Sequence, residues 1–315
     1  MEILPHEKQI QEYHRTIEHL KKQNQNNSLF SQEIKKLEQK LEILKEKVYS
    51  ELTPWERVQI CRHPDRPHTS DYIKQLAKDF HELSGDRLFG DDHSIIGGIG
   101  EIDGLKCVLI GQEKGNDTES RVYRNFGMPN PEGYRKALRL MKLAEKFQLP
   151  LITFLDTAGA NPILEAEERG QASAIAVNLR EMSRLKVPII VIVIGEGCSG
   201  GAIGIGVGDI VAMLEHAYYS VISPEGCASI LYKDPTKKVE SAQALKLTSE
   251  DLLNLGVIDA IINEPLGGAH HNPEVAFKNV KKFILDETAL LKNLPVDLLI
   301  EQRYLKFRRI GAFLI

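Results

Sequence analysis

The residues best suited to chemistry form a glycine-rich turn directly after an apolar run. Seven of the fourteen residues from 195 to 208 are glycine, and they follow the run Pro188 to Ile194. Glycine loses much conformational entropy on folding, so this density implies that the backbone closely approaches another group. A helix that starts at about Ser199 would point its first free N–H groups out of the turn. The pattern therefore predicts that Gly200 and Gly201 stabilise a negatively charged oxygen.

A second turn of the same kind follows an earlier apolar run and contains Gly159 and Ala160. An enzyme that handles an enolate needs backbone donors aimed at the developing oxyanion, each worth about 3 kcal/mol when preorganised. The side chains near both turns offer no obvious general base, and Ser199 is the one evident nucleophile. We predict that Gly159, Ala160, Ser199 and Ala202 bind the substrate.

Other interpretations of the first turn stay open at this stage. Residues 197–201 match the G-x-S-x-G pattern of a serine hydrolase, with Ser199 as nucleophile, although no local pattern identifies its acid and histidine. Gly204 and Gly208 continue a four-residue spacing that equally fits close packing of a helix on a sheet. Cys198 could be acidified by the helix terminus, but a cysteine is more often a small buried filler.

Several classes of site are not indicated. No Gly-Lys-Ser/Thr follows the glycine turn and the dinucleotide fingerprint is poorly matched, so neither ATP nor NAD is implied. We predict no metal site, since His270 and His271 would point to opposite faces of a strand or diverge on a helix. The four cysteines are far apart and contain no C-x-x-C pair, which argues against a zinc ribbon or a disulfide framework.

Composition narrows the class of protein. The chain has 315 residues, a net charge of −4 and a pI near 6.2, so charge alone does not suggest nucleic acid as a partner. The N-terminus lacks a hydrophobic signal core, and no apolar run approaches the roughly 20 residues needed to cross a bilayer. We therefore predict a cytoplasmic protein without a membrane segment.

The N-terminal region differs in kind from the remainder. It contains no glycine up to residue 50 and carries two apolar stripes at helical spacing, which predict a helical hairpin with its loop at Asn24 to Ser28. Thr53, Pro54 and Glu56 form a helix-start signature. We therefore divide the chain into a hairpin, residues 1–52, and a main domain, residues 53–315. The stripes are Ile10, Tyr13, Ile17 and Leu20, and Ile34, Leu37, Leu41, Leu44 and Val48.

From about residue 90, short apolar strands alternate with helices. Two strands flank the turn Asp103-Gly104 as a hairpin. A helix opens at Pro131, and we expect its basic residues to form a solvated face. A later helix of about twenty residues should carry acidic side chains in its first turn and basic ones in its last. The expected basic face is Arg135, Lys136, Arg139 and Lys142, and the expected buried stripe of the later helix is Ala172, Ile175, Leu179 and Met182.

This alternation repeats a strand, strand, helix unit. Ile189 to Ile194 is followed by the glycine turn and a helix, and Ile210 to Leu214 and Tyr218 to Ile222 precede another helix at Pro224. Apolar strands separated by helices predict an α/β layered domain whose strands are buried on both sides. Helical patterns dominate again after about Ser241.

Longer motifs resemble one family closely. The matching segments are Arg-His-Pro-Asp-Arg-Pro at 62–67, Asn-Phe-Gly-Met-Pro-Asn-Pro-Glu-Gly-Tyr-Arg-Lys-Ala-Leu-Arg-Leu at 125–140, Ala-Glu-Glu-Arg-Gly-Gln at 166–171, Gly-Glu-Gly-Cys-Ser-Gly-Gly-Ala at 195–202, Ser-Val-Ile-Ser-Pro-Glu-Gly-Cys-Ala-Ser-Ile-Leu at 220–231 and Glu-Pro-Leu-Gly-Gly-Ala-His at 264–270. The chain resembles the alpha subunits of bacterial acetyl-CoA carboxylase carboxyltransferase, from about Glu46 or earlier to the C-terminus.

The resemblance implies a crotonase-like fold (ClpP/crotonase superfamily) and an α2β2 assembly with a beta subunit. It implies transfer of a carboxyl group from carboxybiotin, held by a biotin carboxyl carrier protein, to acetyl-CoA, giving malonyl-CoA for fatty acid biosynthesis. Biotin then serves as the base, which suits a site with few ionisable side chains. By motif match, Gly200 and Gly201 would stabilise the ureido oxyanion of biotin. The second oxyanion hole and a zinc ribbon would belong to the beta subunit, and ATP to a separate biotin carboxylase.

One segment departs from the family pattern. After Asp156-Thr157 the family loop reads Pro-Gly-Ala-Tyr-Pro-Gly, whereas this chain has Ala158-Gly-Ala-Asn-Pro-Ile163, followed by Leu164 and Glu165. The loss of a proline, a tyrosine and a glycine changes loop stiffness, and Glu165 adds a carboxylate near the expected site. A scaffold that assembles without catalysing is therefore a third hypothesis, beside the carboxyltransferase subunit and the serine hydrolase.

Overall fold

The fold was analysed in a computed structural model that describes residues 4–24 and 30–311, so residues 25–28 of the predicted hairpin loop lie outside the described residues. Its strands are β1 (Lys78–Glu82), β2 (Ile95–Ile102), β3 (Leu105–Gln112), β4 (Leu151–Thr157), β5 (Ile189–Cys198), β6 (Ile210–Leu214), β7 (Tyr218–Ser220) and β8 (Ala260–Ile262). Its α-helices are α1 (Lys8–Asn24), α2 (Ser31–Ser50), α3 (Pro54–Cys61), α4 (Thr69–Leu76), α5 (Thr118–Tyr123), α6 (Pro131–Phe147), α7 (Leu164–Glu168), α8 (Gln171–Arg184), α9 (Ser199–Ile203), α10 (Pro224–Cys227), α11 (Lys238–Ala244), α12 (Ser249–Asn254), α13 (Pro273–Lys292) and α14 (Val296–Arg309). Shorter turns are η1 (Pro5–Glu7), η3 (Asn125–Gly127), η4 (Ala228–Tyr232) and η5 (Pro235–Lys237).

One mixed sheet forms the centre of the molecule. Its strand order is β1-β2-β3-β4-β5-β6-β8, and β7 pairs with the far end of β5. The predicted hairpin is confirmed, because β2 and β3 are antiparallel across Asp103 and Gly104, which both have positive φ as a tight hairpin turn requires. From β3 onward the paired strands are parallel. All residues of β4 and β5 are buried, as expected for strands covered on both faces.

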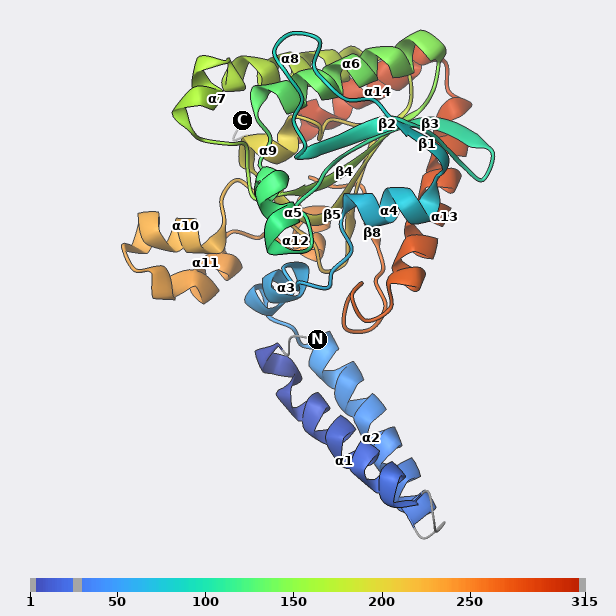
Figure 1. The fold of residues 1–315 in the computed structure, drawn as a ribbon, viewed down its shortest axis with the longest axis vertical. Helices are drawn as coiled ribbons and strands as arrows, with labels where there is room; N and C mark the ends of the chain where they lie inside the picture. The colour runs from blue at the N-terminus through green and yellow to red at the C-terminus, as the bar shows by residue number, and fades with distance from the viewer. Residues whose placement is uncertain (1–3, 25–29, 312–315) are drawn as a thin grey trace.

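Helices cover both faces of this sheet. Helices α6 and α8 form one layer, with α14 beside α8, and α4 and α13 lie on the opposite side (Figure 1). Helix α13 turns Ala276, Val280 and Ile284 towards the core, and all three are fully buried. None of the helices within residues 4–24 and 30–311 combines the length and apolar character needed to span a bilayer.

The prediction of one long helix after β4 is wrong in one respect, because this segment forms two helices, α7 and α8. Gly170 has a φ of 87° and separates α7 from α8. The predicted stripe is also wrong in part, since Ala172 is exposed and Ile175 and Leu179 are only partly buried. Polar side chains occupy the buried face because they satisfy backbone carbonyls. Gln171 donates to Pro129 O and Asn161 O, and Asn178 donates to Tyr134 O and Gly204 O.

The basic side of α6 is not the solvated face that we expected. Lys136 is fully buried, and its Nζ lies 2.7 Å from both Asp91 Oδ1 and the carbonyl oxygen of Asp92. Arg135 Nε likewise lies 2.8 Å from Asp86 Oδ2. These acids belong to the connection between β1 and β2, which covers this side of α6. The solvated-face interpretation holds for Lys142, which is exposed, and fails for Arg135 and Lys136 because their partners lie more than forty residues away in sequence.

The N-terminal helices form the predicted hairpin, which projects away from the main body (Figure 1). Both apolar stripes face each other, with Ile10, Ile17, Ile34 and Leu41 at its centre. The next helix, α3, begins at the predicted signature, where Thr53 N donates to Glu56 Oε2 at 2.8 Å. The division into units at residue 52 stays a prediction, because the hairpin's apolar cluster includes a residue of α3.

A buried arginine anchors α14 to the core. Arg303 of α14 is 1% exposed, and it donates to the carbonyl oxygens of Met182, Leu185 and Val187 at 2.8–2.9 Å. Its guanidinium also forms two 2.7 Å hydrogen bonds with the carboxylate of Asp209. The Arg303 side chain therefore supplies hydrogen bonds to the carbonyl groups that lie between α8 and β5.

Replacing this arginine should destabilise the chain strongly. Arg303→Ala leaves a buried carboxylate without its partner, and such losses cost about 3–5 kcal/mol. The matched control Arg308→Ala lies on the exposed side of the same helix and should change the free energy of unfolding by less than about 0.5 kcal/mol. Urea unfolding followed by circular dichroism measures both, and equal stability of the two variants would contradict the assigned role of Arg303.

Candidate functional site

The glycine turn is formed where β5 ends and α9 begins, as predicted. Ser199 starts α9 with a φ of 53°, a conformation that few residues other than glycine adopt. Gly200 is half-buried, and a Cβ there would meet only Ile175 Cδ1, at 3.4 Å. Gly201 is buried, and a Cβ there would lie 2.7 Å from Ala160 N and against Gly159. Gly201 is therefore required for close packing, whereas Gly200 has open space beside it.

The two predicted turns lie side by side. Thr157 of β4 pairs in register with Gly197 of β5, which brings the loop containing Gly159 and Ala160 against α9. Gly159 has a φ of 149°, and its N–H donates to Thr157 Oγ1 at 3.1 Å. This amide is therefore already engaged, contrary to our expectation of a free donor. Ala202 is fully buried, so its side chain supports α9 from behind.

Two of the candidate residues line an open pocket. The pocket has a volume of about 510 Å³, and both Ser199 and Gly200 reach it, whereas Gly201 does not. Most of its other side chains are apolar. The N–H groups in the first turn of a helix have no acceptor within the helix, so α9 presents donors at one end of an apolar chamber. The remaining lining residues are Ile203, Tyr219, Ser220, Val221, Leu245, Leu252 and Val257.

A buried charge network lies beneath the two turns and was missed from the sequence. Lys114 Nζ lies 2.7 Å from Asp156 Oδ1 and 2.5 Å from Glu196 Oε2. Asp156 also accepts from His68 Nδ1 at 2.7 Å and from the backbone N–H of Glu196 at 3.0 Å. We name these four residues the strand-end network. It joins the carboxyl ends of β4 and β5, the strands that carry the candidate loops.

Electrostatics keep both carboxylates of this network ionised. Burial raises the pKa of Glu196, but Lys114 and Arg62 outweigh it and lower that pKa to about 2. Burial likewise opposes ionisation of Asp156, and Lys114 and His68 hold its pKa well below the usual range. Neither carboxylate is suited to act as a general base near neutral pH. The network therefore positions the turns, in agreement with the predicted lack of a base.

Two signals in the sequence could have indicated this network. Asp156 ends an apolar strand, and Glu196 stands between two glycines directly after another. Parallel strands place such residues at one edge of the sheet. The partner Lys114 follows β3, the neighbour of β4, so topology was needed to bring the three together.

The geometry gives little support to a serine hydrolase or to a reactive cysteine at this turn. The Ser199 side chain forms no hydrogen bond with any residue in the described ranges, so no histidine or acid is placed to activate it. Cys198 is buried, and burial, with Glu196 nearby, raises the pKa of its thiol to about 11. Cys198 is thus an inert filler. Gly204 and Gly208 are packing glycines, as one interpretation held, since Cβ atoms there would lie 2.7 Å from Tyr134 and Val191.

The neighbouring histidines do not diverge, and that expectation was wrong. His270 and His271 lie in the turn before α13, in neither a helix nor a strand, with ring centroids 4.4 Å apart. His271 Nε2 lies 3.2 Å from Glu7 Oε1, at the base of the hairpin. The prediction of no metal in this chain was based on their divergence.

Comparison with known proteins identifies the family. The family described as acetyl co-enzyme A carboxylase carboxyltransferase-like matches residues 3–311. The chain belongs to this family. It is 67% identical, over 314 residues, to the acetyl-coenzyme A carboxylase carboxyl transferase subunit alpha of Protochlamydia amoebophila, covering 100% of this chain and 99% of that protein. The protein of the same name from Chlamydia trachomatis serovar L2 is 60% identical, with 99% and 97% covered.

Solved structures confirm the crotonase-like fold. Transcarboxylase 12S superposes with a TM-score of 0.55 at 17% identity, covering 70% of this chain and 42% of that longer chain. A Pseudomonas malonate decarboxylase hetero-tetramer in complex with coenzyme A gives a TM-score of 0.56 at 15% identity, covering 68% of this chain and 86% of that one. At such identities the likeness establishes the fold alone.

The strand-end network predicts a loss of stability in acid. Because the folded-state pKa of Glu196 lies below its ordinary value of 4.5, its contribution is complete above about pH 5 and is lost as the pH falls towards 2. The free energy of unfolding in urea should therefore decrease between pH 5.5 and pH 3, and less steeply in Glu196→Gln. Glu167→Gln changes the net charge equally at an exposed position and should keep the wild-type slope. Equal slopes in all three proteins would contradict this.

Proposed function

We propose that this chain is the alpha half of a biotin-dependent carboxyltransferase, which transfers a carboxyl group from carboxybiotin to acetyl-CoA and forms malonyl-CoA. The observation that carries the proposal is 67% identity across the whole chain to a relative named as that subunit. The geometry is compatible with it, because the site offers backbone donors and apolar walls and no activated nucleophile.

The pocket beside α9 fits the chemistry of biotin. A bicyclic ring with an apolar body and one polar ureido oxygen needs apolar walls and a few converging donors. Ile203, Leu252 and Val257 supply such walls, and Gly200 adds no side chain at the point where α9 starts. When bound, carboxybiotin supplies the carboxyl group that is transferred. The N–H group of Gly200, which lines the pocket, and that of Gly201, one residue further into α9, would hold the ureido oxygen and stabilise its charge.

The remaining residues of this chain orient the site and shape it. Gly159 and Ala160 would contact the substrate, with Gly159 kept in place by its two hydrogen bonds to Thr157. Ser199 and Ala202 would fix the start of α9. The loop that differs from the family pattern is held in place by a hydrogen bond in which Asn161 Nδ2 donates to Asn130 Oδ1 at 2.8 Å. Glu165 is exposed on α7, so its carboxylate can point into solvent and away from an anionic substrate.

Exposed apolar side chains beside the site favour a partner subunit. Leu164 on α7 is 69% exposed, and Val221, Ile230 and Leu231 are 68–74% exposed around α10, which protrudes from the body (Figure 1). Exposed apolar groups gathered in this way mark interaction surfaces. The proposal includes a beta subunit in an α2β2 assembly, a biotin carboxyl carrier protein and a biotin carboxylase. It also includes a cytoplasmic location, which the four free, buried thiols favour.

Reconstitution tests this function directly. The purified chain alone should form no malonyl-CoA, and it should become active when the beta subunit and the carboxylated carrier protein are added, because half of the site is expected on the partner. Ser199→Ala should retain most of this activity. Turnover by the chain alone that disappears in Ser199→Ala would favour the hydrolase, and assembly without product would favour the scaffold.

The roles of the paired glycines can be separated by substitution. Gly201→Val forces a side chain against Gly159 and Ala160, and the reconstituted activity should fall about 10²-fold or more. Gly200→Ala should lower the activity roughly 10-fold with little change in Tm, because its methyl group has space but displaces the bound oxygen. In the control Gly90→Ala an added methyl meets nothing within 4 Å and should leave activity unchanged. Full activity in both Gly200→Ala and Gly201→Val would overturn the site assignment.

A further inference from the structure

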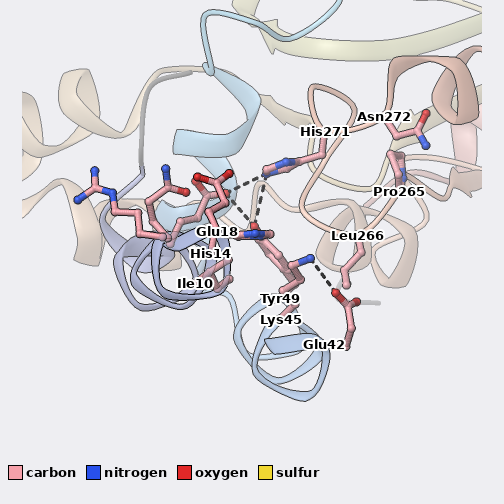
Figure 2. Close-up of a pocket in the computed structure, with 13 residues that line it drawn as sticks. Ile10, His14, Glu18, Glu42, Lys45, Tyr49, Pro265, Leu266, His271 and Asn272 are labelled. Atoms are coloured by element: carbon pink, nitrogen blue, oxygen red, sulfur yellow. Dashed lines mark hydrogen bonds and ion pairs between the residues drawn. The ribbon is translucent and has the colours of Figure 1, made fainter. Parts of the chain in front are cut away.

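A second pocket lies between the N-terminal hairpin and the main body, away from the glycine turns. It has a volume of about 610 Å³ and is lined by residues of α1 and α2 on one side and by residues 265–272 on the other. Figure 2 shows His271 and Tyr49, from opposite sides of this junction, pointing towards each other at the pocket. Solvent and small ions therefore reach the junction.

Three potential metal ligands converge beside this pocket. Glu7, His270 and His271 each offer one ligand atom, and these atoms all lie within 4.8 Å of one another. The Glu7 Oε1 to His271 Nε2 distance is 3.2 Å. In a tetrahedral zinc site with bonds of about 2.0–2.1 Å, neighbouring ligand atoms are about 3.3 Å apart. Two ligands thus already have the spacing that zinc requires, and the ligand atom of His270 lies within 4.8 Å of both.

His270 provides the independent evidence that a ligand is missing here. Its side chain is 5% exposed, and neither ring nitrogen has a hydrogen-bond partner. A buried polar group without a partner is costly, so an imidazole in this state calls for an explanation.

We propose that Glu7, His270 and His271 bind a zinc ion that joins the hairpin to the main body. Two imidazoles and one carboxylate are a ligand set that zinc adopts in proteins, with a fourth position left for water. Glu7 precedes α1, and the two histidines precede α13, more than 260 residues later. The ion would therefore connect the first and last thirds of the chain.

The surrounding residues support such a site. Tyr49 donates from its hydroxyl to Glu7 Oε1 at 2.8 Å, and a hydrogen bond of this kind orients a ligating carboxylate. Gly267 and Gly268 have positive φ angles, and a Cβ at Gly268 would lie 3.1 Å from His270 Nδ1. The turn therefore brings the backbone close to the ligands only because it contains glycine.

The charges that face the cluster do not oppose a cation. Arg66 acts on His270 electrostatically, but its guanidinium is paired with Glu264 by two hydrogen bonds of 2.7 and 2.8 Å. In the pocket, Glu18 and Glu42 offset Arg15 and Lys45. With Glu7 ionised, the cluster carries a net negative charge.

Zinc binding by the purified full-length chain tests the proposal. The chain is used without its expected beta subunit, which would contribute zinc of its own. After removal of metals with EDTA, titration with ZnCl₂ in a calorimeter should give one ion per chain, and elemental analysis after gel filtration should agree. Co²⁺ should give the visible absorption of a tetrahedral complex. Zinc should also raise the Tm.

Matched variants distinguish this site from other histidines. His271→Gln, His270→Gln and Glu7→Gln should each weaken zinc binding more than about 10-fold and abolish the rise in Tm. His14→Gln lies in the same pocket outside the cluster and should bind as the wild type does. His271 is partly exposed, so its variant should fold normally, which circular dichroism without metal checks. A wild-type chain that binds no zinc, or His271→Gln binding zinc as the wild type does, would overturn the proposal.

Discussion

The structure depends on one electrostatic constraint, the pairing of two carboxylates buried at the ends of neighbouring parallel strands. Asp156 and Glu196 would be too costly to bury alone, and Lys114 compensates both. Gly195 leaves the space in which the Asp156 carboxylate lies against the β5 backbone. Because this arrangement sets how β4 and β5 end, it also sets the distance between the loops that follow them. The charged groups thus fix the backbone of the two loops that carry the candidate site residues.

The separation of charged side chains from the apolar walls of the pocket explains the chemical character of the candidate site. Strong charges lie below the strand ends, where partners hold them, while the pocket above is mostly apolar. A preorganised amide needs no reorganisation when charge develops on a bound oxygen, and an apolar wall strengthens its effect. The proposed role of the backbone donors at this site is consistent with this arrangement. The two glycines are not equivalent, since Gly201 permits close packing and Gly200 faces the pocket.

Patterns that depend on neighbours in sequence were predicted well. The hairpin stripes, the turn at Asp103-Gly104 and the helix start at Thr53 are local signals, and each appears in the fold as expected. The glycine turn was also found, because glycine density reports a close backbone approach directly. Apart from the break at Gly170, which splits one predicted helix into two, the interpretations that failed needed distant partners. Lys136, Asn178 and His270 are all buried beside residues far away along the chain, and periodicity carries no information about such pairs.

The position of Arg303 has a consequence for biosynthesis. This side chain completes the hydrogen bonding of carbonyl groups that lie more than one hundred residues earlier, and it does so from the last helix of the chain. Until α14 has left the ribosome, the nascent polypeptide lacks the arginine that pairs with Asp209 and that donates to the carbonyl oxygens between α8 and β5. Domains commonly fold as units during synthesis. In this protein, that final step must wait until α14 has been synthesised.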